Sequence, residues 1–98
     1  MSVGPPPHFN YHGPHVPAAR TGAVRLEWSP ILPRADRLRV RDHTCSCRYP
    51  MFEFCTAGGL WFVRRHPVKA LAGILESAWM PARAAQDLWL QILSGEAQ

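Results

Sequence analysis

The chain has 98 residues, of which 47% are hydrophobic and 18% charged, and its formal net charge is +4. This length sets one domain as the upper limit, and the hydrophobic fraction excludes a chain that is disordered throughout. Neither a secretory signal nor an apolar stretch near the ~18 residues that span a bilayer is visible, so we expect a cytoplasmic protein that does not contact membranes. The three cysteines, an odd number, favour reduced thiols over a disulfide framework.

Residues 1–22 hold five of the ten prolines and show no regular periodicity. Proline lacks the backbone donor that a helix or strand uses, so we expect a flexible, disordered arm here and a single small domain over 23–98. His8, His12 and His15 are metal ligands by type. Nothing in the sequence holds them in place, which favours a solvated tail.

The segments 24–28 and 37–41 each alternate apolar and charged residues, which predicts two half-buried strands. Pro30 and Pro33 end the first of them. The side chains expected to face the core are Val24, Leu26, Trp28, Leu38 and Val40. The arginines expected to face outward are Arg37, Arg39 and Arg41.

A β-hairpin is predicted over 52–63, where two apolar runs flank a short glycine-containing turn. Gly58 and Gly59 can adopt the positive φ angles that such a turn uses. For the next segment we expect a turn through 67–73 and a short strand at 74–78, because Gly73 and Pro81 interrupt the helical alternative.

A single helix is predicted over 81–94, with Gly95 at its C-terminal cap. Its apolar face comprises Ala85, Leu88, Trp89 and Ile92. The resulting fold is α+β, an antiparallel β-meander of about four strands with the helix packed on the face that carries Leu26, Leu38 and Val40. Trp61, Trp79 and Trp89 are expected to fill one core.

The segment HTCSCRYPMFEFC holds all three cysteines, and its candidate metal ligands are His43, Cys45, Cys47 and Cys55. A regular strand would place residues 43, 45 and 47 on one face, but ~6.6 Å apart, which is too far for a zinc ion. The Cys-x-Cys spacing also differs from usual zinc motifs. We therefore expect structural cysteines and no cofactor, with zinc as the alternative. A bulge near 42–43 would be needed to turn Cys45 and Cys47 inward.

A basic surface is predicted from five residues: Arg37, Arg39, Arg41, Trp61 and Arg65. Arginine and tryptophan are common at the centres of protein interfaces, so the first hypothesis is a non-enzymatic module that binds a protein partner with an acidic surface. The alternative is a nucleic-acid-binding accessory protein that uses the same arginines. The seven acidic residues are scattered, and we expect no catalytic site.

The order of CSCRYPMFEFC, AGG, FVRR, a Trp-x-Pro step, LW and LSG resembles small proteins common in actinobacteria. The resemblance covers about residues 40–97. It implies no activity, because that group has no established function. It does favour the strand at 74–78 over a helix.

Overall fold

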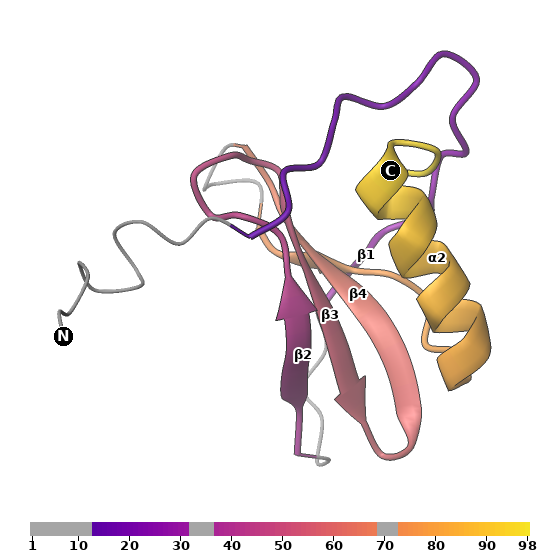
Figure 1. Cartoon of the computed structure of the whole chain (residues 1–98). Helices are drawn as coiled ribbons and strands as arrows, with labels where there is room; N and C mark the ends of the chain where they lie inside the picture. Colours follow the sequence, from indigo (N-terminus) through magenta and orange to yellow (C-terminus); the bar gives the residue numbers. More distant parts are fainter. Residues whose placement is uncertain (1–12, 32–36, 69–72) are drawn as a thin grey trace, which may run out of the picture.

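The computed structural model describes residues 13–31, 37–68 and 73–98, and these form one antiparallel sheet with a helix on one face (Figure 1). The elements are β1 (Ser29–Pro30), β2 (Arg39–His43), β3 (Met51–Ala57), β4 (Leu60–His66), β5 (Leu75–Glu76) and α2 (Ala82–Ser94). The strand order is β1-β5-β4-β3-β2, so β2 to β5 form the predicted meander and β1 adds a fifth strand. The α+β class is confirmed. No helix in the described part of the chain has the length and apolar character that crossing a membrane requires.

The β3–β4 hairpin is the longest pairing in the sheet, and it confirms the prediction over 52–63. Ala57 pairs with Leu60, which leaves a two-residue turn between the strands. Gly58 and Gly59 have φ angles of 58° and 80°. Two positive φ angles define the turn whose twist matches that of the flanking strands. The turn therefore sets the register of the whole hairpin.

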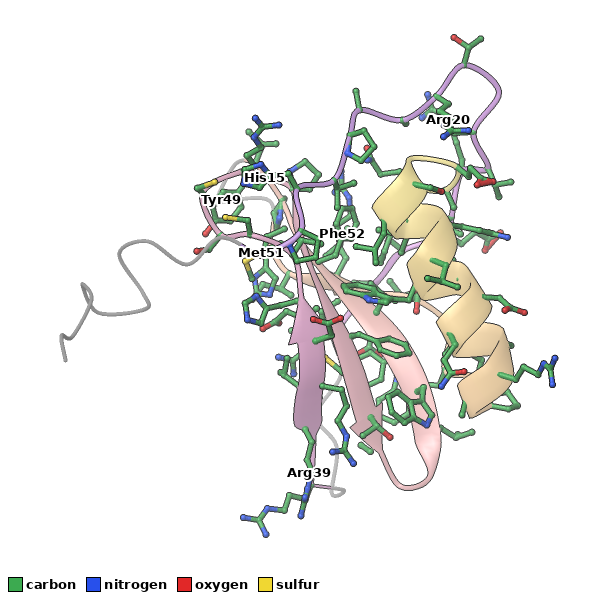
Figure 2. The ribbon with its side chains drawn as sticks, in the orientation of Figure 1. His15, Arg20, Arg39, Tyr49, Met51 and Phe52 are labelled. Atoms are coloured by element: carbon green, nitrogen blue, oxygen red, sulfur yellow. The ribbon has the colours of Figure 1, made fainter. Side chains whose placement is uncertain are left out.

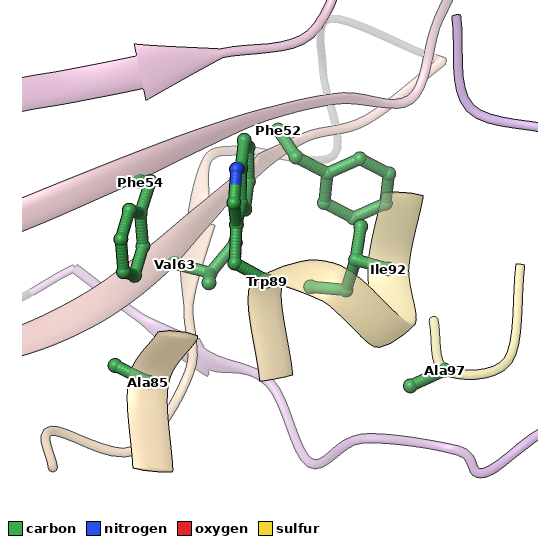
Figure 3. Close-up of a cluster of buried hydrophobic side chains, with 7 residues drawn as sticks. All are labelled: Phe52, Phe54, Val63, Ala85, Trp89, Ile92 and Ala97. Atoms are coloured by element: carbon green, nitrogen blue, oxygen red, sulfur yellow. The ribbon is translucent and has the colours of Figure 1, made fainter. Parts of the chain in front are cut away.

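The main core lies between the hairpin and α2 (Figure 3). Phe54 and Val63 are cross-strand partners, and the ring of Phe54 stacks on Trp89 with centroids 5.3 Å apart. The members of this core are Phe52, Phe54, Val63, Ala85, Trp89, Ile92 and Ala97. Full burial of a large apolar side chain contributes roughly 1.5–3 kcal/mol. The predicted apolar face of the helix is therefore what holds α2 on the sheet.

The C-terminus of α2 contacts the segment 13–22, which precedes the first strand of the sheet. Gly95 has a φ of 80°, and the N–H groups of Gly95 and Glu96 donate to the carbonyls of Ile92 and Gln91. This is a Schellman cap, as the glycine predicted. The carbonyl of Gly95 in turn accepts from the backbone N–H of Arg20 at 2.9 Å. Residues 13–22, expected to be part of a flexible arm, thus lie against the domain, and residues 1–12 are outside the described part.

The first predicted strand, 24–28, is displaced toward the C-terminus. The structure has only an isolated bridge at Val24, whereas Pro30, expected to end the strand, lies inside β1. The Val24 backbone bonds to Glu96 and Gln98 of the C-terminal segment, and its side chain, expected to face the core, is 58% exposed. Proline is tolerated in β1 because this is an edge strand. Leu26 and Trp28 do pack against the core, as predicted.

A bulge between Val40 and Asp42 reverses the predicted orientation of β2. Val40 pairs with Cys55 on the face away from α2 and is 43% exposed, so its predicted core position is wrong. Asp42 faces the helix instead, where it accepts a hydrogen bond from Trp89. The extra residue of a bulge shifts the alternation of side chains, and the arginines of β2 consequently lie on the helix side.

The four tryptophans divide between two faces of the sheet, which corrects the prediction of one core. Trp61 and Trp89 both pack on Phe54 on the helix side. Trp79 stacks on Phe62 on the opposite face, with centroids 4.2 Å apart. The predicted strand at 74–78 is shorter in the structure, Leu75–Glu76. After it, Met80 and not Trp79 pairs with Trp61, a shift of one residue from the Arg64–Glu76 register. Most of the predicted turn, 69–72, lies outside the described residues.

Candidate metal centre

The loop after β2 positions two of the three cysteines. β2 ends at His43, and the buried Thr44 then joins the loop to β3. The N–H of Thr44 donates to the carbonyl of Phe52 at 2.8 Å, and the N–H of Phe52 donates to the Thr44 hydroxyl at 2.9 Å. The N–H of Arg48 donates to the carbonyl of Cys45, which closes a turn. Cys45 is buried and Cys47 is exposed on the same turn.

Residues 13–15 pack directly on the backbone of this loop. The N–H of Cys45 donates to the carbonyl of Pro14 at 3.0 Å. At Gly13, a Cβ atom would lie only 3.2 Å from the carbonyl oxygen of His43, so a residue without a side chain suits this close approach. The next residue but one, His15, is thereby placed beside the cysteines. Figure 2 shows His15 at the same end of the sheet as Tyr49, which lies in the loop.

Three metal-ligand atoms meet at this point. The Sγ atoms of Cys45 and Cys47 are 3.0 Å apart, and the Nε2 atom of His15 is 3.3 Å from the Sγ of Cys47. All three donor atoms lie within 4.8 Å of one another. Bond lengths of ~2.3 Å for sulfur and ~2.0–2.1 Å for nitrogen put two ligands of a tetrahedral zinc ion roughly 3.5–3.8 Å apart. The two donor pairs that include Cys47 therefore need to separate by less than about 1 Å to hold an ion, while the third pair already lies within 4.8 Å.

The two thiols of this cluster are hydrogen-bonded to each other. This hydrogen bond with Cys45 is the main cause that raises the pKa of Cys47 above its ordinary value, because it favours the protonated pair. Since the metal ligand is the thiolate, binding of an ion releases these protons. Two soft thiolates with one imidazole form a ligand set that suits zinc or copper(I).

Of the four predicted ligands, the structure brings Cys45 and Cys47 together and separates the other two from them. Cys55 is fully buried within β3, and this burial raises its pKa to about 12. His43 is exposed, and its Nδ1 atom lies 3.0 Å from the carbonyl oxygen of Thr44. The histidine of the cluster is His15 and not the predicted His43, although the sequence favoured a solvated tail for the segment that contains His15. The proline-rich segment carries no periodicity that would predict this approach.

The structure brings together only some of the five residues of the predicted basic surface. Arg41 lies with its Cζ atom 5.9 Å from the ring centroid of Trp61, so these two predicted residues do meet. Arg65 lies instead over Trp28, at 6.0 Å. The arginines at 37 and 39 are exposed and precede Arg41 on the chain. Arg65 therefore belongs to a different part of the sheet, with an aromatic partner that the sequence did not suggest.

No family model, curated protein or solved structure gives a significant match to the chain. The resemblance of residues 40–97 to small actinobacterial proteins therefore stays a prediction.

Proposed function

We propose that this protein is a small non-enzymatic metal-binding protein that holds a thiophilic ion through His15, Cys45 and Cys47. The observation that carries the proposal is the convergence of three donor atoms within 4.8 Å, from segments about thirty residues apart. It favours the zinc alternative of the sequence analysis over a purely structural role for the cysteines. That the protein has no catalytic activity remains a prediction.

The exposure of the cluster supports an exchangeable ion over a sealed structural one. His15 and Cys47 are exposed, and Cys45 also lines a cavity of about 300 Å³ with Arg48 and Tyr49. Structural zinc sites are closed by four protein ligands. Three donors leave one position of a tetrahedral zinc ion open for water or an incoming ligand. Copper(I) also fits this site, because it prefers soft thiolate ligands. An ion held in this way can be acquired from and passed to another molecule.

Metal titration of the reduced, chelator-treated full chain tests this proposal. Zinc(II) and copper(I) are each titrated against a chromophoric competitor, with cobalt(II) as a spectroscopic probe of thiolate ligation. We expect one ion per chain. Cys47→Ser should weaken binding by about 100-fold, because a four-ligand zinc site is worth about 10–16 kcal/mol, or roughly 3 kcal/mol per ligand. His15→Ala should have a similar effect.

Cys55→Ala is the matched control, because Cys55 is a cysteine of the same chain that lies outside the cluster. It should bind the ion with unchanged affinity. Wild-type protein that binds no ion above one-tenth of an equivalent would contradict the proposal. An equal loss of affinity in Cys55→Ala and Cys47→Ser would also contradict it, since the assigned ligands would then be wrong.

A further inference from the structure

Arg39, Arg41 and Trp61 form a second surface, which we call the Arg–Trp surface. Arg39 pairs across the strands with Thr56, and Thr56 pairs with Trp61. Directly opposed residues of adjacent strands point to the same face, so Arg39 and Trp61 share one side of the sheet. Arg41 joins them through its position over the Trp61 ring. The bulge in β2 brings these side chains together. Asp42 pairs with Phe54, so without a bulge Arg41 would pair with Cys55 and would lie on the opposite face from Trp61.

This surface lies at the other end of β2 from the metal centre. Figure 2 shows Arg39 near the hairpin turn, pointing away from the ribbon, whereas His15 lies beyond the opposite end of the strand. No residue of the Arg–Trp surface belongs to the donor cluster. The Arg–Trp surface is therefore a site separate from the metal centre, and a ligand bound here goes beyond the proposed function.

The Trp61 platform is held rigidly. Its backbone N–H and carbonyl both bond to Met80 at 2.8 Å, and its ring packs on Phe54 with centroids 4.8 Å apart. A guanidinium over a fixed aromatic ring loses little further freedom when it binds a ligand. Within residues 13–31, 37–68 and 73–98, no carboxylate forms an ion pair with Arg39 or Arg41. Both guanidinium groups are thus presented to an external anion.

The position of β2 at the edge of the sheet indicates that the anionic ligand is an extended chain. β2 is an edge strand whose five residues are all exposed, and β3 is its one neighbour among the described strands. The outer side of an edge strand offers backbone groups to an extended chain. The bulge at Arg41 brings two guanidinium groups that are two residues apart in the sequence to one side of β2. The complementary ligand carries two or more carboxylates close together along one extended segment.

We propose that the Arg–Trp surface and the edge of β2 bind an acidic segment of a partner protein in an extended conformation. Guanidinium groups pair with carboxylates through two parallel hydrogen bonds, and arginine and tryptophan dominate the energetics of protein interfaces. A polyphosphate backbone fits less well, because tight nucleic-acid binding uses about six or more phosphate contacts. The surface offers two guanidinium groups.

Fluorescence anisotropy with defined probes tests the inference. The probes are a labelled peptide that alternates Glu and Val, the same peptide with Gln in place of Glu, and a labelled oligothymidylate. Wild-type protein should bind the Glu peptide at least about 10-fold more tightly than the Gln peptide, the equivalent of one charge-assisted contact. The Arg39→Gln/Arg41→Gln variant should lose that preference. Arg25→Gln/Arg83→Gln removes the same charge from exposed positions elsewhere and should keep it.

Circular dichroism of each variant establishes that the sheet is intact, as expected for substitutions at exposed positions. Equal affinity of wild-type protein for the two peptides would overturn the inference. So would an equal loss in both double variants, which would indicate a general effect of charge. Tighter binding of the oligothymidylate, lost on Arg39→Gln/Arg41→Gln, would assign the surface to nucleic acid instead. The anisotropy measurements use chelator-treated protein without added metal, because a Glu carboxylate could otherwise occupy the open position of a bound zinc ion, and these results are then separate from those of the metal titration.

Discussion

The contact between Trp89 and Asp42 joins α2 to the edge of the sheet, and its removal should lower the free energy of unfolding. Trp89 Nε1 donates to Asp42 Oδ2 at 3.2 Å. A hydrogen bond to a charged group contributes about 1.5–3 kcal/mol, and the lower end applies because Asp42 is exposed and its freed carboxylate regains water. Trp89→Phe also leaves a small cavity beside Phe54, which costs about 1 kcal/mol more. We expect a total loss of roughly 2.5 kcal/mol for Trp89→Phe.

A double-mutant cycle isolates the hydrogen bond from the cavity. Urea unfolding of wild type, Trp89→Phe, Asp42→Ala and the double variant, followed by circular dichroism, gives the coupling free energy between the two side chains. It should be about 1–1.5 kcal/mol, with an unchanged dependence on urea concentration. Asp87→Ala, at an exposed position of α2, serves as the control and should change stability by less than about 0.5 kcal/mol. A coupling below about 0.3 kcal/mol would refute the reasoning, because the two residues would then act independently.

Two further predictions concern stability. Since burial raises the pKa of Cys55 to about 12 in the folded state, from 9.0, the folded protein holds this proton more tightly than the unfolded chain. The contribution of Cys55 to the free energy of unfolding is therefore fully present below pH 9 and is lost as the pH rises toward 12, by up to about 1.4 kcal/mol per pH unit. Urea unfolding of Cys55→Ala between pH 9 and 12 should lack this pH-dependent loss. At Gly95 a Cβ atom would lie 3.0 Å from the carbonyl oxygen of Ala18, whereas at Gly59, with the same φ of 80°, it would meet nothing within 4 Å. Gly59→Ala should therefore cost about 1–2 kcal/mol and Gly95→Ala at least about 1 kcal/mol more; equal losses would contradict the role of the Ala18 contact.

The sequence alone determined the parts of the fold that depend on near neighbours. The hairpin follows from two apolar runs around Gly58 and Gly59, whose φ angles the turn requires. The helix follows from an apolar face at helical spacing, and its end from Gly95. Each of these features rests on residues within a few positions of one another, where periodicity and turn chemistry act without help from the rest of the chain.

Strand orientation was decided by tertiary structure. Alternation predicted Val40 in the core, but a bulge of one residue inverted the face on which β2 presents its side chains. A shift by one residue exchanges the two faces of a strand, and it depends on how β2 pairs with β3. Trp79 is a similar case, because Met80 pairs with Trp61 in its place and Trp79 stacks on Phe62 on the other face.

The metal centre shows the same division. The sequence singled out Cys45 and Cys47 but combined them with His43 and Cys55, the nearest residues of the right type. The cluster instead takes His15, 32 positions before Cys47, because Pro14 bonds to the backbone of Cys45. An irregular segment carries no periodic signal, so the place where it crosses a distant loop depends on backbone hydrogen bonds and close packing that only the folded chain provides.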